Sequence, residues 1–205
     1  MSNGRSTVGA LHKRRDSLSL LRQFLRAPAV IGAVAPSSRV LAECMVKDVD
    51  LKHAEAVLEF GPGTGSFTNH ILERLPSGCR FLAIELDQVM ADIWSRRYPG
   101  QKLCVDRVEE VASICDAEGI ERVDAVFSGL PWATFDHDAQ RRTLEGTVSV
   151  LKPGGRFVTF GYWFGTLMPR GKRFYELLPR YFSEVTYSRY VWRNLPPAFV
   201  VQCRK

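Results

Sequence analysis

The sequence predicts a single α/β domain of the doubly wound kind, with helices on both faces of a mostly parallel sheet. Three observations support this prediction. A chain of 205 residues is long enough to bury one large hydrophobic core. From about Ala54 onward, short apolar runs alternate with helical patterns, which is the order found in parallel sheets. A glycine-rich turn follows the first apolar run, at the place where such folds bind ligands.

The apolar runs predict the strands in order. Those of the parallel sheet are expected at 56–60, 81–85, 102–105, 124–128 and 156–160. The helices between them are expected near 66–75, 87–97, 107–116 and 137–150, with Pro-Gly turns at several of their ends. After a further helix near 172–181, two apolar runs at 183–192 and 198–203 have no helix between them. We therefore expect an antiparallel pair that completes a seven-stranded sheet.

Residues 1–36 are predicted to form a basic amphipathic helical arm that precedes the domain at 37–205. Apolar side chains at helical spacing share one face, arginines border it, and Pro28 ends the helix. The residues expected to contact a membrane are Arg15, Leu18, Leu21, Arg22, Phe24, Leu25 and Arg26. Packing of this helix on the domain is the alternative. A second helix is expected after the capping pair Ser37-Ser38.

Charge is divided unevenly along the chain. The net charge is +6, with +6 in residues 1–39, −8 in 40–151 and +8 in 152–205. Basic ends favour a polyanionic partner, either nucleic acid or an anionic membrane, whereas a solvated basic face is the simpler explanation. No window approaches the roughly 18 apolar residues of a spanning helix. The N-terminus lacks the apolar core of a secretory signal, so we expect a cytoplasmic protein. The five cysteines are scattered and no metal motif is present, so no metal is expected.

The strongest local signal is the sequence Glu59–Gly65, directly after the first strand. Its glycines allow a tight turn and a close approach of the backbone to a ligand. They are Gly61, Gly63 and Gly65. A dinucleotide fingerprint would require Gly or Ala at one of the positions that Ser66 and Thr68 occupy. Glu59 suits a ligand with a cationic amino-acid end.

Two further acids follow neighbouring strands. Glu85 ends the second strand, where a carboxylate can accept hydrogen bonds from both hydroxyls of a ribose, and a merely exposed carboxylate is the alternative. Asp106 closes the third strand and can accept from an adenine amine, or it can cap the helix expected at 107–116. The residues that follow them, Leu86 and Arg107, are included in the predicted cofactor site.

The fourth strand ends in Ser128-Gly129-Leu130-Pro131-Trp132. Together with EFGPGTG, AIELD and the acid after the third strand, this order resembles the class I S-adenosylmethionine-dependent methyltransferases. The resemblance implies a Rossmann-like seven-stranded sheet and S-adenosylmethionine as cofactor. In members that methylate amines, the matching oxygens hold the amine and the aromatic ring flanks the methyl path. It therefore assigns catalytic roles to Ser128, Pro131 and Trp132, with Ser128 also near the cofactor. Serine is a weaker acceptor than the Asn or Asp of nucleobase enzymes.

A closer resemblance covers nearly the whole chain. FLRAPAVIGAVAPSSRVLAE before the fold and VWRNLPPAFV at its end resemble the small bacterial phospholipid N-methyltransferases. These act on phosphatidylethanolamine, and relatives act on aminolipids such as ornithine lipids. The resemblance implies that Arg193 and Asn194 lie near the lipid phosphate or head group. GYWFGTLMPR departs from the shorter segment expected in the loop over the acceptor.

Methyl transfer to an amine is an in-line displacement, so positioning and desolvation are the enzyme's main tasks. The amine must lose a proton first. Tyr162, Asp136 and His137 are candidate acceptors, although each is more often structural, and the proton can instead leave to water. Aromatic rings at Trp132, Tyr162 and Trp163 suit a sulfonium or a methylated ammonium, or they belong to the core.

These inferences lead to an aminolipid N-methyltransferase associated peripherally with the inner face of the cytoplasmic membrane. The arm would lie in the anionic interface. The alternative is an RNA or DNA adenine-N6 methyltransferase, since basic flanks fit polyphosphate equally well. Only about fifty residues follow the fifth strand, which leaves no room for a target-recognition domain, so no nucleic-acid partner is expected. A third possibility is an inactive adaptor that binds the cofactor without using it.

Overall fold

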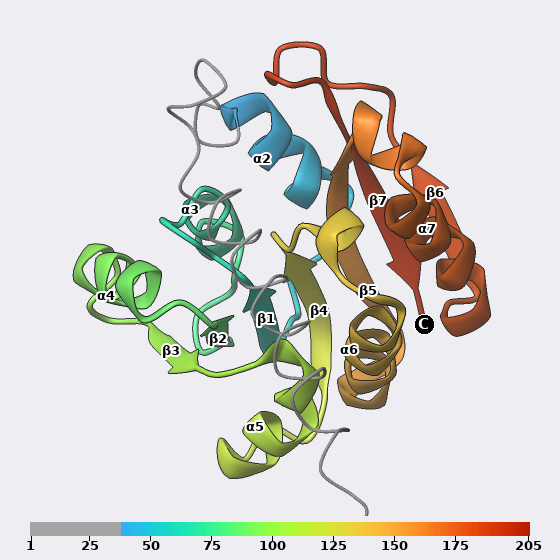
Figure 1. Ribbon diagram of the computed structural model, residues 1–205. Coiled ribbons are helices and arrows are strands. Elements are labelled where there is room, and N and C mark those ends of the chain that lie inside the picture. The colour runs from blue at the N-terminus through green and yellow to red at the C-terminus, as the bar shows by residue number, and fades with distance from the viewer. Residues whose placement is uncertain (1–37) are drawn as a thin grey trace, which may run out of the picture.

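A computed structural model describes residues 38–205 of the chain (Figure 1). The predicted arm at 1–36, with its leucine face and arginine border, lies outside the described residues. Within residues 38–205, no helix is long and apolar enough to cross a membrane.

Seven strands form one sheet in the order β3-β2-β1-β4-β5-β7-β6, which confirms the predicted fold class (Figure 1). The strands are β1 (Ala56–Phe60), β2 (Arg80–Glu85), β3 (Lys102–Val105), β4 (Val123–Ser128), β5 (Leu151–Tyr162), β6 (Glu184–Tyr187) and β7 (Ala198–Arg204). The first five run parallel, and β7 is antiparallel to both of its neighbours. The predicted closing pair is therefore present, although β6 is shorter than the apolar run at 183–192.

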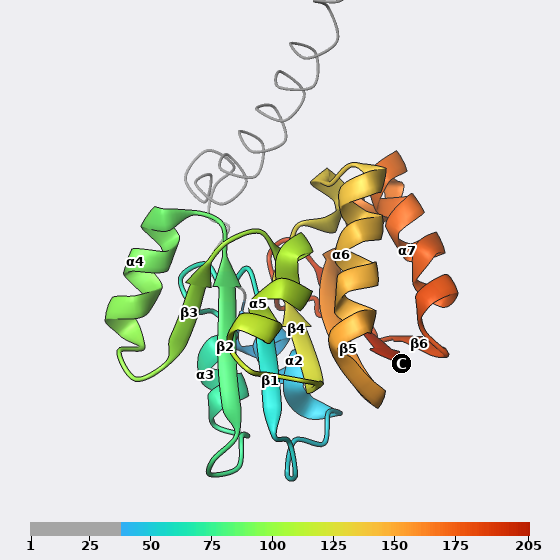
Figure 2. The same ribbon diagram turned by 90° about the horizontal axis from the view of Figure 1, so that it is seen from below.

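Helices cover both faces of the sheet (Figure 2). One face carries α2 (Arg39–Lys47), α3 (Thr68–Leu72) and α4 (Gln88–Arg97), and the other carries α5 (Val111–Ala117), α6 (His137–Val150) and α7 (Pro169–Tyr181). Two expected helices differ in extent. The pattern at 107–116 forms a 3-10 turn, η1 (Val108–Glu110), before α5 begins, and the pattern at 66–75 gives only the short α3.

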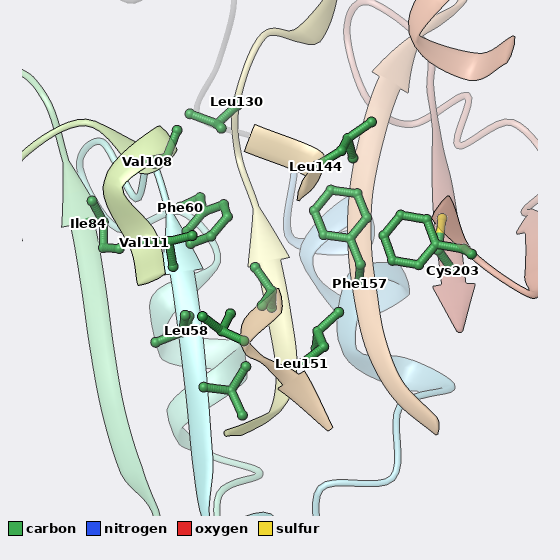
Figure 3. Packing of buried hydrophobic residues seen from close by; sticks show 14 of the residues in the cluster. Leu58, Phe60, Ile84, Val108, Val111, Leu130, Leu144, Leu151, Phe157 and Cys203 are labelled. Atoms are coloured by element: carbon green, nitrogen blue, oxygen red, sulfur yellow. The ribbon is translucent and has the colours of Figure 1, made fainter. Parts of the chain in front are cut away.

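The central strand β1 has no exposed face, because all five of its residues are buried. Leu58 and Phe60 point to the α5–α6 side, where Val111 and Leu144 meet them (Figure 3). Val57 belongs to the second cluster, under α2, α3 and α4. Burial on both sides explains why the strand is a nearly continuous apolar run rather than an alternating one. Glu59 is therefore an ionisable side chain within an otherwise apolar, fully buried strand.

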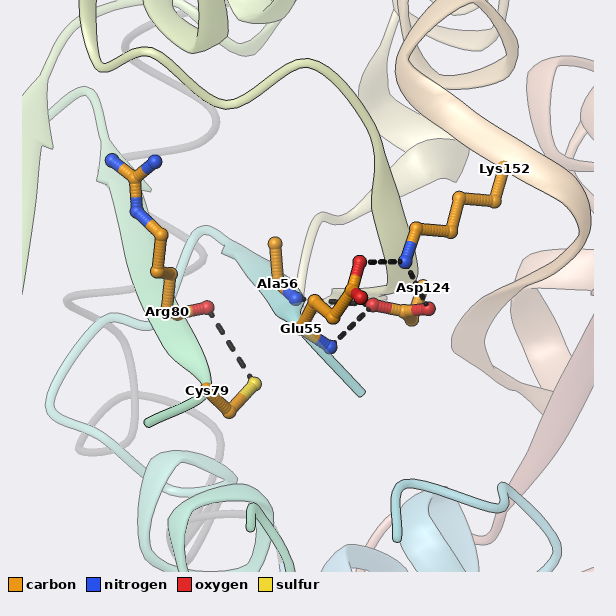
Figure 4. A network of polar contacts seen from close by, with 6 residues as sticks. All are labelled: Glu55, Ala56, Cys79, Arg80, Asp124 and Lys152. Atoms are coloured by element: carbon orange, nitrogen blue, oxygen red, sulfur yellow. Dashed lines mark hydrogen bonds and ion pairs between the residues drawn. The ribbon is translucent and has the colours of Figure 1, made fainter. Parts of the chain in front are cut away.

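At the amino edge of the sheet, a carboxylate fixes the start of β1 (Figure 4). Asp124 Oδ2 accepts hydrogen bonds from the backbone N–H groups of Glu55 and Ala56, at 2.7 and 3.0 Å. Lys152 Nζ bridges Asp124 and the Glu55 side chain, at 2.9 and 2.6 Å. This cluster ties β4, β5 and β1 together at the end of the sheet opposite the glycine turn.

Candidate active site

The carboxyl ends of β1, β2, β3 and β4 meet at one edge of the sheet, because these strands are parallel. Backbone hydrogen bonds join the segments that leave them. Gly61 N–H donates to Ile84 O at 2.8 Å, Asp106 N–H to Glu85 O at 3.1 Å, and Gly129 N–H to Phe60 O at 2.8 Å. The structure thus brings together the four motifs that the sequence analysis singled out.

The glycine turn leaves one open position. Gly61, Gly63 and Gly65 have φ values of +61°, +55° and +89°, which side chains other than hydrogen rarely allow. A Cβ on Gly61 would lie 2.8 Å from Leu130 Cδ2, and one on Gly65 would lie 2.5 Å from the Tyr98 ring. Gly63 has nothing within 4 Å of that position. The turn therefore packs on the protein at its two ends and presents its middle to a ligand.

Glu85 joins the end of β2 to the glycine turn. Its carboxylate is 4% exposed and accepts hydrogen bonds from the backbone N–H groups of Leu86 and Asp87 at Oε1, and of Gly63 at Oε2. Each oxygen has two lone pairs, so acceptor capacity remains at Oε2 for a ribose hydroxyl. Desolvation raises the pKa of Glu85, and the three amides oppose that rise. The expected cofactor residue is thus also a positioning residue of the turn.

Glu59 is buried beneath the same turn and is 1% exposed. Its Oε2 accepts from the Thr68 hydroxyl at 2.6 Å, and that hydroxyl in turn accepts from Trp94 Nε1 at 2.9 Å. Its Oε1 has no hydrogen-bond partner among residues 38–205. Desolvation, supported weakly by the charge of Glu85 and opposed by the Thr68 hydrogen bond, raises the pKa of Glu59 to about 8. Sequence reasoning missed Thr68 and Trp94, because nothing local marks them.

An unpartnered buried carboxylate oxygen and an open glycine fit S-adenosylmethionine. Its ammonium group can satisfy Glu59 Oε1, and its ribose can reach Glu85. Asp106 is exposed and, among the described residues, accepts a hydrogen bond only from the N–H of Arg107, at 2.7 Å, so it has capacity for an adenine amine. Arg107 itself pairs with Glu109 at 2.8 Å. No side chain caps η1, so the alternative role of Asp106 as a helix cap was wrong.

Two successive hydrogen bonds hold the fourth motif, Ser128–Trp132, in place. Trp132 Nε1 donates to Thr159 Oγ1 at 3.0 Å, and that hydroxyl donates to the backbone oxygen of Ser128 at 3.0 Å. Ser128 is fully buried, with its Oγ 3.4 Å from the Leu130 N–H. A Cβ on Gly129 would lie 2.7 Å from Gly61 O, so this segment packs directly on the glycine turn. The half-buried Pro131 continues the segment into the 3-10 turn η2 (Trp132–Thr134).

Trp132, which the resemblance places beside the methyl path, packs into the hydrophobic core. The side chain is 3% exposed, and its ring stacks on Phe174 with centroids 4.3 Å apart and planes 12° apart. Phe157 meets it edge-on at 6.0 Å. With one face covered and its N–H bonded to Thr159, the indole positions the fourth motif. Phe174 lies 42 residues away, so local sequence could not reveal this packing.

Two of the three candidate proton acceptors, Tyr162 and Asp136, make contacts that stabilise the fold. Tyr162 ends β5, half-buried, stacked on Phe164 and edge-on to Phe160, each at 5.5 Å. Burial raises its pKa, so the phenol stays neutral at physiological pH. Asp136 caps α6 by accepting from the Ala139 N–H at 2.8 Å. His137 is exposed at the start of the same helix. Trp163, the third aromatic residue expected to bind a cation, is 47% exposed just beyond β5.

Asn194, which the resemblance places near the lipid head group, has hydrogen-bond partners within the protein at both ends of its side-chain amide. It is 3% exposed, its Oδ1 accepts from the Ser38 N–H at 2.8 Å, and its Nδ2 donates to Pro196 O at 2.7 Å. The amide therefore fastens the start of α2 to the β6–β7 connection. Arg193 is exposed and lines a groove between that connection and α2.

The known proteins that this chain resembles are methyltransferases, in agreement with the site at the carboxyl edge of the sheet. Residues 57–155 match the family model described as a methyltransferase domain. The chain is 32% identical over 195 residues to an ornithine lipid N-methyltransferase from Singulisphaera acidiphila, covering 93% of this chain and 96% of that protein. It is 33% identical to a chloroplastic ribosomal RNA small subunit methyltransferase from Arabidopsis thaliana, covering 49% of this chain and 28% of that protein. An O-methyltransferase from Bacillus cereus, solved in complex with SAH, has a TM-score of 0.67 at 19% identity, covering 93% of this chain and 91% of that chain.

The fold, the domain match and the structural likeness place the protein among the class I S-adenosylmethionine-dependent methyltransferases. Within that class, the chain belongs to the family of the Singulisphaera ornithine lipid N-methyltransferase, because their similarity runs through nearly the full length of both proteins.

Proposed function

We propose that the protein transfers methyl groups from S-adenosylmethionine to the amine of a membrane aminolipid, such as ornithine lipid or phosphatidylethanolamine. The observation that carries the proposal is the full-length similarity to an ornithine lipid N-methyltransferase. We place the reaction at the inner face of the cytoplasmic membrane, where the anionic surface and the lipid substrate are its partners. The two basic ends of the chain support this location.

The chain's own residues position the reactants. When bound, the cofactor supplies a methyl group on a positively charged sulfur. Glu59 Oε1 would hold its ammonium, Glu85 its ribose and Asp106 its adenine, while the Trp132–Thr159–Ser128 chain fixes the acceptor side. Tyr162 remains protonated in its buried surroundings, so we infer that the amine loses its proton to water before it binds.

Methylation of RNA is the second candidate, favoured by the partial similarity to ribosomal RNA methyltransferases. That similarity covers only 28% of the Arabidopsis protein. The described residues after β5 are used by the 3-10 turn η3 (Trp163–Leu167), α7, β6 and β7. All of these elements belong to the methyltransferase sheet or to the turn and the helix that follow β5.

A labelling assay separates the two functions. With radiolabelled S-adenosylmethionine, we expect label in ornithine lipid or phosphatidylethanolamine presented in vesicles or micelles, and none in RNA oligomers. The mass of extracted lipids from a host that lacks methylated lipids then identifies the head group and the number of methyl groups. Label in RNA, with none in either lipid, would reverse the ranking.

The arm provides a second test of location. Replacing Arg15, Arg22 and Arg26 with glutamate should release the protein from anionic vesicles in a sedimentation assay, because each arginine contributes about 1 kcal/mol at such a surface. High salt should have the same effect on the native protein. The matched control replaces the same three residues with lysine, which keeps the charge. Equal sedimentation of the native and glutamate proteins would show that the arm does not attach the protein.

A further inference from the structure

Exposed apolar side chains gather in two connections at the carboxyl edge of the sheet. Eleven large hydrophobic residues are exposed within residues 38–205; six of them lie between β5 and α7 or between β6 and β7, and a seventh, Tyr187, is the last residue of β6. The seven are Trp163, Leu167, Met168, Tyr187, Tyr190, Trp192 and Leu195. Leu167 and Trp192 are each 74% exposed, and Leu195 is 71% exposed. Clusters of this kind are typical of interaction surfaces, whereas scattered exposed residues are not.

The two connections lie side by side. Trp163 N–H donates to Pro197 O at 3.2 Å, and Tyr162 pairs with Ala198 in the sheet. The aromatic side chains of the second connection are also held in place, because Tyr190 packs against Phe199 and Trp192, with ring centroids 5.6 and 5.7 Å apart. The apolar residues therefore form one surface with a fixed base and exposed tips.

Exposed arginines lie in the β6–β7 connection and in α7, directly after the β5–α7 connection. Arg173, Arg189 and Arg193 are exposed, and none of them forms a salt bridge with another of the described residues. Arg189 and Arg193, together with Lys47 of α2, line a groove of about 470 Å³ beside the β6–β7 connection. An aromatic and aliphatic surface bordered by unpaired arginines matches the interface of an anionic bilayer. The arginine stems can remain among the apolar groups while their heads contact phosphates.

We propose that this surface, defined by the exposed side chains of the β5–α7 and β6–β7 connections, inserts into the interface of an anionic membrane. The domain thus has a membrane contact of its own, separate from residues 1–36. The proposal rests on the proposed function in one respect: a lipid acceptor requires the carboxyl edge to approach the bilayer.

Tryptophan fluorescence can detect this membrane contact, because the exposed tryptophans lie on the proposed surface. The chain has four tryptophans, of which Trp94 and Trp132 are 0% and 3% exposed, whereas Trp163 and Trp192 are 47% and 74% exposed. None lies in residues 1–37. Vesicles of phosphatidylcholine and phosphatidylglycerol should shift the emission of the full chain to shorter wavelength, and brominated acyl chains should quench it. Trp192→Phe should lose a large part of both effects. Unchanged emission from protein that sediments with the vesicles would overturn the proposal.

A pair of double variants tests the energetics. Leu167→Ser with Trp192→Ser, one residue from each connection, should lower the affinity for these vesicles at least about tenfold. The matched control is Val89→Ser with Ile93→Ser, two exposed residues of α4 on the other side of the molecule, and it should bind as the native protein does. Equal affinity of the two double variants would contradict the proposal.

Methylation assays in micelles and in vesicles distinguish the membrane-contact proposal from the proposed methyltransferase function. In detergent micelles, where no bilayer is needed, the single variant Trp192→Ser should methylate an aminolipid at the native rate, and in vesicles it should be slow. If native protein inserts its tryptophans but methylates neither ornithine lipid nor phosphatidylethanolamine in micelles, the proposed function is wrong and the membrane contact stands. If micellar methylation is normal and insertion is absent, the membrane contact is wrong and the function stands.

Discussion

Replacing Glu85 with alanine should weaken S-adenosylmethionine binding by about 1.5–3 kcal/mol, because charge-assisted hydrogen bonds to the ribose would be lost. The structure adds a second effect. The Glu85 carboxylate accepts from the N–H groups of Gly63, Leu86 and Asp87, so its removal also frees the glycine turn from the end of β2. Calorimetry of the folded variant measures the binding loss, and urea denaturation should show a fall of about 1–3 kcal/mol in the free energy of unfolding.

Asp124→Ala is the matched control for this substitution. Asp124 also accepts two backbone N–H groups, from Glu55 and Ala56, but at the opposite edge of the sheet (Figure 4). The control should therefore lower stability without changing cofactor affinity. If Glu85→Ala binds S-adenosylmethionine as tightly as the native protein does, Glu85 does not belong to the cofactor site.

Binding of S-adenosylmethionine near pH 7 should release about one proton from Glu59. The pKa of this buried carboxyl is raised to about 8, so the free protein holds it protonated at pH 7. A cationic ammonium beside the unpartnered Oε1 would favour the ionised form and expel the proton. Calorimetry in two buffers that differ in ionisation enthalpy counts the released proton. The affinity should rise as the pH approaches 8 and then level off.

Glu59→Gln is the decisive variant, because it keeps the shape and removes the titration. It should bind the cofactor more weakly and without proton release. The raised pKa of Glu59 affects folding in the opposite direction: a rise in pH favours cofactor binding but destabilises the fold. A carboxyl whose pKa is about 8 when folded and about 4.3 when unfolded stabilises the fold fully below pH 4, and this contribution is lost as the pH rises to 8. Relative to the variant, the native protein should therefore lose several kcal/mol of unfolding free energy across that range. Equal pH profiles of the two proteins, or cofactor binding without proton release, would contradict the assignment.

The elements that depend on local pattern could be predicted from sequence. β1, β4 and the antiparallel ending follow from apolar runs whose burial is periodic or complete, and the glycine turn follows from backbone conformations that few residues adopt. Glu59, Glu85 and Asp106 were placed at one edge because parallel strands end together. For these positions, it was sufficient to know where the strands end along the chain and that they run parallel.

Two of the predicted site residues, Trp132 and Asn194, have partners that are far away in sequence. Trp132 was expected beside an acceptor, but Phe174 covers one face of its ring. Asn194 was expected at a head group, but it bonds Ser38, which is 156 residues away. Side-chain amides and indoles suit both a ligand and a packed interior. Only the tertiary contacts distinguish the two, so the spacing of residues in the sequence could not.

The hydrogen bond between Ser38 and Asn194 also bears on how the molecule would be oriented at the proposed membrane. It holds Ser38, the first described residue, to the connection that carries Trp192, at the carboxyl edge of the sheet. A flat surface that engages both the arm and this connection would therefore lie across that edge. The strands would then stand upright on the bilayer, and the Asp124–Lys152 cluster would point toward the aqueous phase. Such an upright orientation would let a lipid amine approach the glycine turn while the tails remain in the hydrocarbon layer.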